Sequence, residues 1–148
     1  MKELNIGEQV TNLENWEVHK IFTNPNNGYY GATFINHKNH HIILAHRGAV
    51  VIDGMRDIVW KDSILEANIA MLFNAFVIQQ FEAYQATNET VQLAQDKNYS
   101  LSVTGYHLGA WLAEQSVYFS RMDFHFDNIK GVTFESPGSN DLLGSVDI

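Results

Sequence analysis

The chain has 148 residues, of which 45% are hydrophobic, and its 17 acidic and 9 basic side chains give a formal net charge of −8. This length and composition predict a single globular domain with a sizeable core. The acidic balance argues against nucleic acid as a partner, and the absence of cysteine excludes disulfides, thiolate metal sites and a cysteine nucleophile.

The N-terminal segment, residues 1–27, is polar and has no apolar core of the signal-peptide type. The longest apolar run, residues 69–81, is short and interrupted by Asn74, Gln79 and Gln80, which is too little to span a bilayer. We therefore expect no transmembrane segment and a cytoplasmic location, with leaderless export left open. The expected organisation is one truncated domain over residues 1–148, in which residues 1–27 form an N-terminal polar extension.

Apolar runs bounded by turn residues predict two strands in the first half of the chain, at residues 29–35 and 41–45, and a further apolar run covers residues 49–52. A long stretch without glycine or proline follows. Ser63 and Glu66 form a capping-box pattern at its start, which predicts one long helix or two consecutive helices that end near Lys97. We interpret the apolar run 64–81 as core packing, with a lipid-facing lid helix as the alternative.

The second half of the chain predicts a strand, a helix and a strand, at residues 99–104, 107–120 and 129–134. Alternating strands and helices indicate the α/β class, with a mostly parallel sheet of about four to five strands and helices on both faces. Ligands of such sheets bind at the carboxyl ends of the strands. Three loops are expected to meet at that rim, at residues 46–49, 105–107 and 136–138.

The segment from Gly105 to Gly109 has the spacing of a nucleophile elbow, a sharp strand-to-helix turn in which the central residue attacks the substrate. The central position is His107, and the glycines on either side leave room for the tight turn. The N–H group of Leu108 would lie at a helix N-terminus, where it forms half of an oxyanion hole. Tyr106 completes the elbow.

Three blocks of sequence together resemble the class three (fungal-type) lipase branch of the α/β-hydrolases, over roughly residues 28–140. They read Leu-Ala-His-Arg-Gly-Ala, Leu-Ser-Val-Thr-Gly-Tyr-His-Leu-Gly-Ala and Val-Thr-Phe-Glu-Ser-Pro-Gly, and they begin at Leu44, Leu101 and Val132. The resemblance implies a partial α/β-hydrolase core and an ancestry in ester hydrolysis. It also implies that Ala49 supplies the second group of the oxyanion hole, beside Leu108.

The departures from this family fall on its chemistry. His107 stands where the family has its nucleophilic serine, Tyr106 replaces the preceding histidine, and Ala49 replaces a threonine or serine. Ala110 replaces the second elbow glycine, a milder change. The family's catalytic aspartate and histidine follow later strands, and Asp141 comes too early for that role. The resemblance therefore implies the fold and predicts impaired catalysis.

Other candidate residues have structural interpretations that we prefer. Ser100, Ser102 and Ser136 are expected to form hydrogen bonds in strands and turns rather than to act as nucleophiles. We place His46, Arg47 and Ser136 on the rim of the crevice. Arg47 is expected to pair with a carboxylate, for which the candidates are Asp53 and Asp57.

Four histidines occur within ten residues, at His37, His40, His41 and His46. Successive strand residues point to opposite faces and no acidic ligand is suitably spaced, so we expect solvated histidines, no metal and no cofactor. A metal site is the alternative. A pair formed by His46 and His107, which would bind a metal or titrate near neutral pH, is a separate hypothesis.

Three functions remain open on the sequence alone. The first is a lipase-like pseudoenzyme, which either binds an acyl or ester small molecule or serves as a scaffold. The second is a weak ester hydrolase that uses His107. The third is a remnant without activity. A sheet that ends with the strand at residues 129–134 has an open edge. We expect a second copy, the N-terminal segment or a downstream fragment to cover it.

Overall fold

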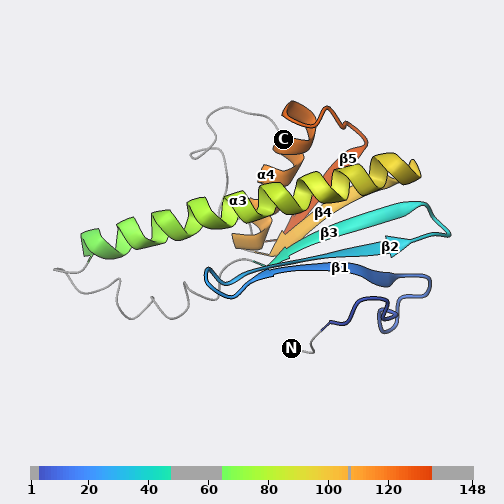
Figure 1. Ribbon diagram of the computed structural model, residues 1–148, viewed down its shortest axis with the longest axis horizontal. Coiled ribbons are helices and arrows are strands. Elements are labelled where there is room, and N and C mark those ends of the chain that lie inside the picture. Colours follow the sequence, from blue (N-terminus) through green and yellow to red (C-terminus); the bar gives the residue numbers. More distant parts are fainter. Residues whose placement is uncertain (1–3, 48–64, 107, 135–148) are drawn as a thin grey trace.

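The computed structural model describes residues 4–47, 65–106 and 108–134, and in residues 65–76 it describes the backbone alone. Within these ranges five strands form one sheet, and two helices cross it (Figure 1). The strands are β1 (Glu17–Asn24), β2 (Tyr29–Asn36), β3 (His41–Arg47), β4 (Ser100–Tyr106) and β5 (Ile129–Phe134). The helices are α3 (Leu65–Lys97) and α4 (Leu108–Met122).

The sheet is mixed, and its strands lie in chain order. Strands β1, β2 and β3 form an antiparallel meander, whereas β3, β4 and β5 are parallel. The parallel arrangement expected from the sequence thus holds in the C-terminal part. Strand β1 lies inside the segment that the sequence analysis reads as a polar extension. Its alternation is weak because most of its side chains are exposed or half-buried at the sheet edge.

Both described helices cover the same face of the sheet. One row of register partners across the strands runs through Lys20, Thr33, Leu44, Val103 and Gly131. At one end of this row Lys20 contacts Glu89 of α3. At the other end, a Cβ atom added to Gly131 would lie 3.1 Å from Val117 of α4.

The shared face corrects the expectation of helices on both faces, as far as the described residues go. The two crossovers, β3–α3–β4 and β4–α4–β5, advance in the same direction across the sheet. Crossovers of one hand that advance in one direction place their helices on one face. Helices on both faces require the strand order to reverse, and from β1 to β5 it does not.

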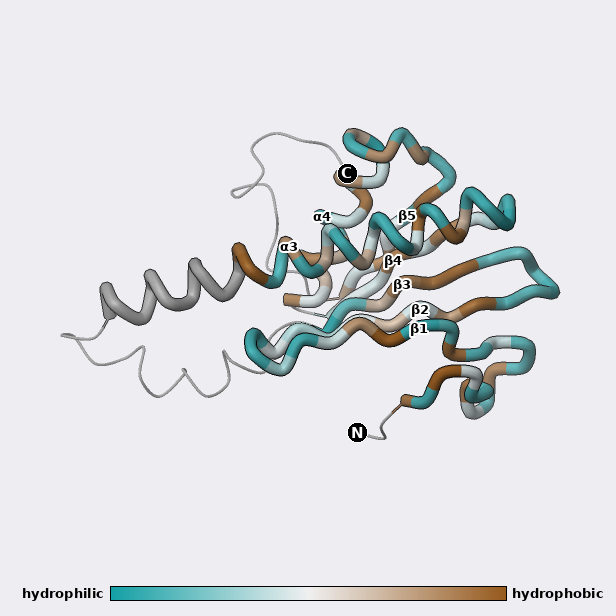
Figure 2. The backbone as a smooth tube through the Cα atoms, in the orientation of Figure 1, coloured by the Kyte–Doolittle hydropathy of each residue, from teal (hydrophilic) through white to brown (hydrophobic). Residues whose placement is uncertain are grey.

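The core lies between this face and the two helices. It is formed by fifteen buried side chains: Tyr29, Ile35, Ile42, Leu44, Ala83, Ala86, Val91, Ala94, Leu101, Val103, Trp111, Leu112, Ala113, Val117 and Ile129. Figure 2 shows that hydrophobic colour concentrates along the strands and that the hairpin turns are hydrophilic. Burial of the strand residues therefore holds the sheet against the helices.

Helix α3 is a single helix of 33 residues, about 50 Å long at 1.5 Å per residue. It packs against β2, β3, β4 and α4, and its N-terminal part extends past the end of the sheet (Figure 1). This settles the choice between one helix and two. Neither α3 nor α4 has a stretch that is long and apolar enough to cross a membrane.

Candidate functional site

The carboxyl ends of the three parallel strands lie side by side. Arg47 is the register partner of Tyr106, and Tyr106 is the register partner of Phe134. The two aromatic side chains are 64% and 57% exposed, so this rim presents apolar surface to solvent. The predicted rim residues Ala49 and Ser136 lie outside the described residues.

The turn from β4 into α4 is very tight, because residue 107 alone separates Tyr106, the last residue of the strand, from Leu108, the first of the helix. A Cβ atom on Gly105 would lie 2.1 Å from the carbonyl oxygen of Gly109 and 2.7 Å from the nitrogen of Ala110. No side chain fits there, because the strand backbone touches the helix backbone directly. This contact explains the glycine at position 105, while His107 itself lies outside the described residues.

Leu108 begins helix α4 and is half-buried. The first N–H groups of a helix have no partner within the helix, and the helix dipole favours negative charge at that end. The position therefore suits the oxyanion role assigned to the Leu108 N–H group. With Ala49 and His107 outside the described residues, that role stays a prediction.

The structure places His46 in the interior, where its side chain is 3% exposed. Its Nδ1 atom lies 2.8 Å from the hydroxyl of Tyr29, and its Nε2 atom lies 2.7 Å from the hydroxyl of Ser116. The Ser116 oxygen also accepts a hydrogen bond from Thr87 at 2.8 Å. We call these four residues the buried relay; they join β2, β3, α4 and α3.

One set of protonation states satisfies the whole relay. Tyr29 donates to Nδ1 of His46, and the Nε2–H group of His46 donates to Ser116. Ser116 then donates to the carbonyl of Leu112 at 3.0 Å. Burial lowers the pKa of His46 to about 3 and raises the pKa of Tyr29 above its usual range. The imidazole is therefore neutral at pH 7, as this pattern requires.

The remaining histidines of the cluster are dispersed. His41 lies between the hydroxyls of Ser100 and Ser102, at 2.5 and 2.7 Å, which gives these two serines the strand role expected of them. His40 stacks on Tyr99 with ring centroids 4.9 Å apart, and His37 lies 3.0 Å from the Tyr99 hydroxyl. Among the described residues no group of three or more His, Cys, Asp or Glu side chains is arranged to hold a metal ion.

Arg47 is exposed at the end of β3, and its guanidinium lies 4.7 Å from the centroid of the Tyr30 ring. This stacking is a contact that the sequence analysis did not anticipate. The carboxylates expected to pair with Arg47, those of Asp53 and Asp57, lie outside the described residues.

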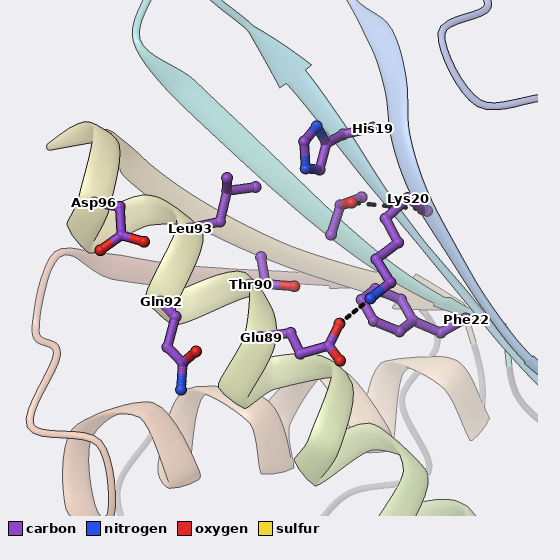
Figure 3. A pocket seen from close by; sticks show the side chains of 9 residues that line it. His19, Lys20, Phe22, Glu89, Thr90, Gln92, Leu93 and Asp96 are labelled. Atoms are coloured by element: carbon purple, nitrogen blue, oxygen red, sulfur yellow. Dashed lines mark hydrogen bonds and ion pairs between the residues drawn. The ribbon is translucent and has the colours of Figure 1, made fainter.

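A groove of about 400 Å³ runs between β1 and α3, far from the elbow in the sequence. Its walls come from His19, Lys20 and Phe22 of β1, from Thr33 of β2, and from α3 between Glu89 and Asp96 (Figure 3). These residues were not predicted as a site, because the sequence pattern did not reveal β1. The signal that was present is the two-residue spacing of Lys20 and Phe22, which lie on the same face of β1.

Comparison with known proteins gives a clear result at the level of the fold. No family model and no curated protein matches the chain. Among solved structures it is similar to the Lip2 lipase of Yarrowia lipolytica, with a TM-score of 0.62 and 20% identity, over 90% of this chain and 50% of that one. It is also similar to the Rhizomucor miehei lipase in its propeptide complex, with a TM-score of 0.58 and 15% identity, over 84% and 42% of the two chains.

A third similar structure is the lipase of Rhizopus microsporus var. chinensis, with a TM-score of 0.50 and 17% identity, over 83% of this chain and 45% of that one. The chain spans about half the length of these solved lipases. At such low identity the comparisons establish the fold. The chain therefore has a partial α/β-hydrolase core of the kind found in the fungal lipases.

Proposed function

We propose that the chain is a lipase-like α/β-hydrolase relative that binds an ester or acyl small molecule at the rim formed by β3, β4 and β5, and that it lacks the serine mechanism. One observation carries the proposal. The Gly105–Gly109 backbone contact has the tightness that a nucleophile elbow demands, and the sequence places His107 between these glycines.

Two further features support binding at this rim. The exposed side chains of Tyr106 and Phe134 offer aromatic surface to an acyl chain. Helix α4 begins at Leu108, two residues after Tyr106, and the first N–H groups of a helix have no partner within it, which suits a carbonyl or carboxylate oxygen of the ligand. One of the similar structures is that of a triacylglyceride lipase, which fits an ester as the ligand class.

Turnover is tested with p-nitrophenyl butyrate, using the native chain, His107→Ala and His107→Ser. Surface imidazoles hydrolyse such activated esters slowly, so the loss of any exposed histidine could lower the rate slightly. The matched control for this background is His125→Asn, which removes one exposed histidine elsewhere. Asparagine suits that position, where the backbone has a φ of 52°. The proposal expects His107→Ala and His125→Asn to leave the rate within about twofold of native.

Binding is tested by titration with decanoate and with a non-hydrolysable ester analogue. The proposal expects saturable binding that Tyr106→Ala weakens and that Tyr118→Ala, a change on a later turn of α4, leaves intact. Native turnover above that of His107→Ala by more than about tenfold would establish the weak-hydrolase alternative instead. Absence of both binding and turnover would identify the chain as a remnant.

A further inference from the structure

The groove between β1 and α3 has a charged rim and a less polar floor. The hydroxyl-bearing Thr33 and Thr90 are buried at its base, and Leu93 is half-buried beside them. The rim carries one lysine, Lys20, and two carboxylates, Glu89 and Asp96. Such a combination suits a ligand with an apolar body and charged ends.

A β-bulge explains how β1 supplies so much of this rim. Val18 pairs with Phe34 and Lys20 pairs with Thr33, so His19 is the extra residue between them. A bulge re-aims side chains that strict alternation would place on opposite faces. His19 and Lys20 therefore both line the groove.

The groove already contains a recognition position for an ammonium group. The Lys20 Nζ atom pairs with the carboxylate of Glu89 and lies 5.1 Å from the centroid of the Phe22 ring. A carboxylate opposite an aromatic face is the chemistry by which proteins bind ammonium ions. Figure 3 shows the Lys20 side chain extending to Glu89 next to the Phe22 ring.

The protein's own lysine is a weak occupant of this position. The side chains of Lys20 and Glu89 are 46% and 52% exposed, and ion pairs with that exposure contribute little to stability. An external ammonium ion would therefore compete with Lys20 for the same carboxylate. The neighbouring His19 is neutral at pH 7, because burial, followed by the charge of Lys97, lowers its pKa, so Lys97 rather than His19 is the nearby cation that opposes the ligand.

A second carboxylate sets the length of the ligand. Glu89 and Asp96 are seven residues apart on one side of α3, which corresponds to about 10 Å along the helix axis. Leu93 lies between them and provides apolar surface for the body of the ligand. We propose that the groove binds a linear aliphatic diammonium ion, with one end on Glu89 and Phe22 and the other on Asp96, in competition with Lys20.

The test is calorimetric titration of the full chain at low ionic strength with 1,8-diaminooctane and 1,4-diaminobutane. The longer diamine matches the carboxylate spacing and is expected to bind more tightly. Lys20→Met is expected to strengthen its binding by about two- to fivefold, because the internal competitor is gone. Lys38→Met, which makes the same change of net charge on the exposed turn between β2 and β3, is expected to have no such effect.

Glu89→Gln and Asp96→Asn provide the converse test. Glu89→Gln is expected to abolish saturable binding, and Asp96→Asn to remove the preference for the longer diamine. The matched control is Asp127→Asn, an exposed position before β5 with the same change of charge. Two outcomes would overturn the proposal, because each would show attraction to the overall charge of −8 instead. The first is equal affinity for the two diamines in both the native and the Lys20→Met protein. The second is an equal effect of Asp127→Asn and Glu89→Gln on binding.

Discussion

The Nε2 atom of His46 lies 2.7 Å from the hydroxyl oxygen of Ser116, and neither side chain is open to solvent. His46 is the register partner of Gly105, so the two residues share one face of the sheet, and this hydrogen bond lies beside the turn that follows Gly105. It fastens the middle of α4 to β3, while the Gly105–Gly109 contact fastens the beginning of α4 to β4. The orientation of the elbow helix is thus set at two points.

Removing one member of the buried relay leaves its partner buried and unsatisfied. We expect Tyr29→Phe and Ser116→Ala each to lower the free energy of unfolding by about 1–3 kcal/mol. Urea denaturation measures this loss. Tyr30→Phe is the matched control, because its ring keeps the contact with Arg47. A loss for Tyr29→Phe no greater than for Tyr30→Phe would contradict the relay as described.

The low pKa of His46 makes stability depend on pH. Its pKa is about 3 in the folded chain and about 6.5 when unfolded, so between these values the unfolded chain binds more protons. Stability is therefore complete above pH 6.5 and falls as the pH drops toward 3, by up to about 1.4 kcal/mol per pH unit from this group.

Replacing the histidine should flatten this profile. We expect His46→Gln to reduce the slope of unfolding free energy against pH between pH 4 and 6, measured by urea denaturation at each pH. His125→Asn serves as the comparison, because that side chain is exposed. Parallel profiles for the native chain and His46→Gln would show that His46 does not carry the effect.

The elbow glycine should tolerate no side chain. In Gly105→Ala the new methyl group would lie 2.1 Å from a backbone oxygen that cannot rotate away. We expect a loss of stability of about 3 kcal/mol or more, at or above the upper end for overpacking. Gly131→Ala is the control, since its Cβ would meet only the end of the Val117 side chain at 3.1 Å. Thermal melts in which both variants lose equally would refute the backbone contact.

The turn between β1 and β2 is clamped to α3 through Asn27, which is 7% exposed. Its side chain donates to Glu82 at 3.2 Å and accepts from the N–H of Tyr29 at 2.9 Å, and its carbonyl accepts from Gln79. Asn27→Ala should therefore cost about 1–3 kcal/mol. The neighbouring Asn26 is exposed, and Asn26→Ala should change stability by less than about 0.5 kcal/mol in the same denaturation experiment.

The tight turn from β4 into α4 was predictable because its signal is local. Gly105 and Gly109 flank one position between an alternating strand and a periodic helix, and the structure gives Gly105 a steric reason. The expectation that His46 lies on the crevice rim was wrong, because it follows Ile42 and Leu44 at the two-residue spacing of the buried strand face. What the sequence could not provide was its partner Ser116, because that pairing depends on how α4 crosses β3.

Strand β1 escaped prediction for a different physical reason. It is an edge strand whose side chains are largely exposed or half-buried, and the bulge at His19 breaks the two-residue period. The groove it forms with α3 was missed for the same reason. The placement of both helices on one face follows from the strand order, which no short-range pattern determines.

Because the strands lie in the order in which they occur in the chain, the sheet can grow by addition at one edge during synthesis. The antiparallel meander from β1 to β3 involves only short loops and can form as soon as it leaves the ribosome. The pairing of β3 with β4 must then wait for the whole of α3, so closing that long connection is expected to be the slow step of folding.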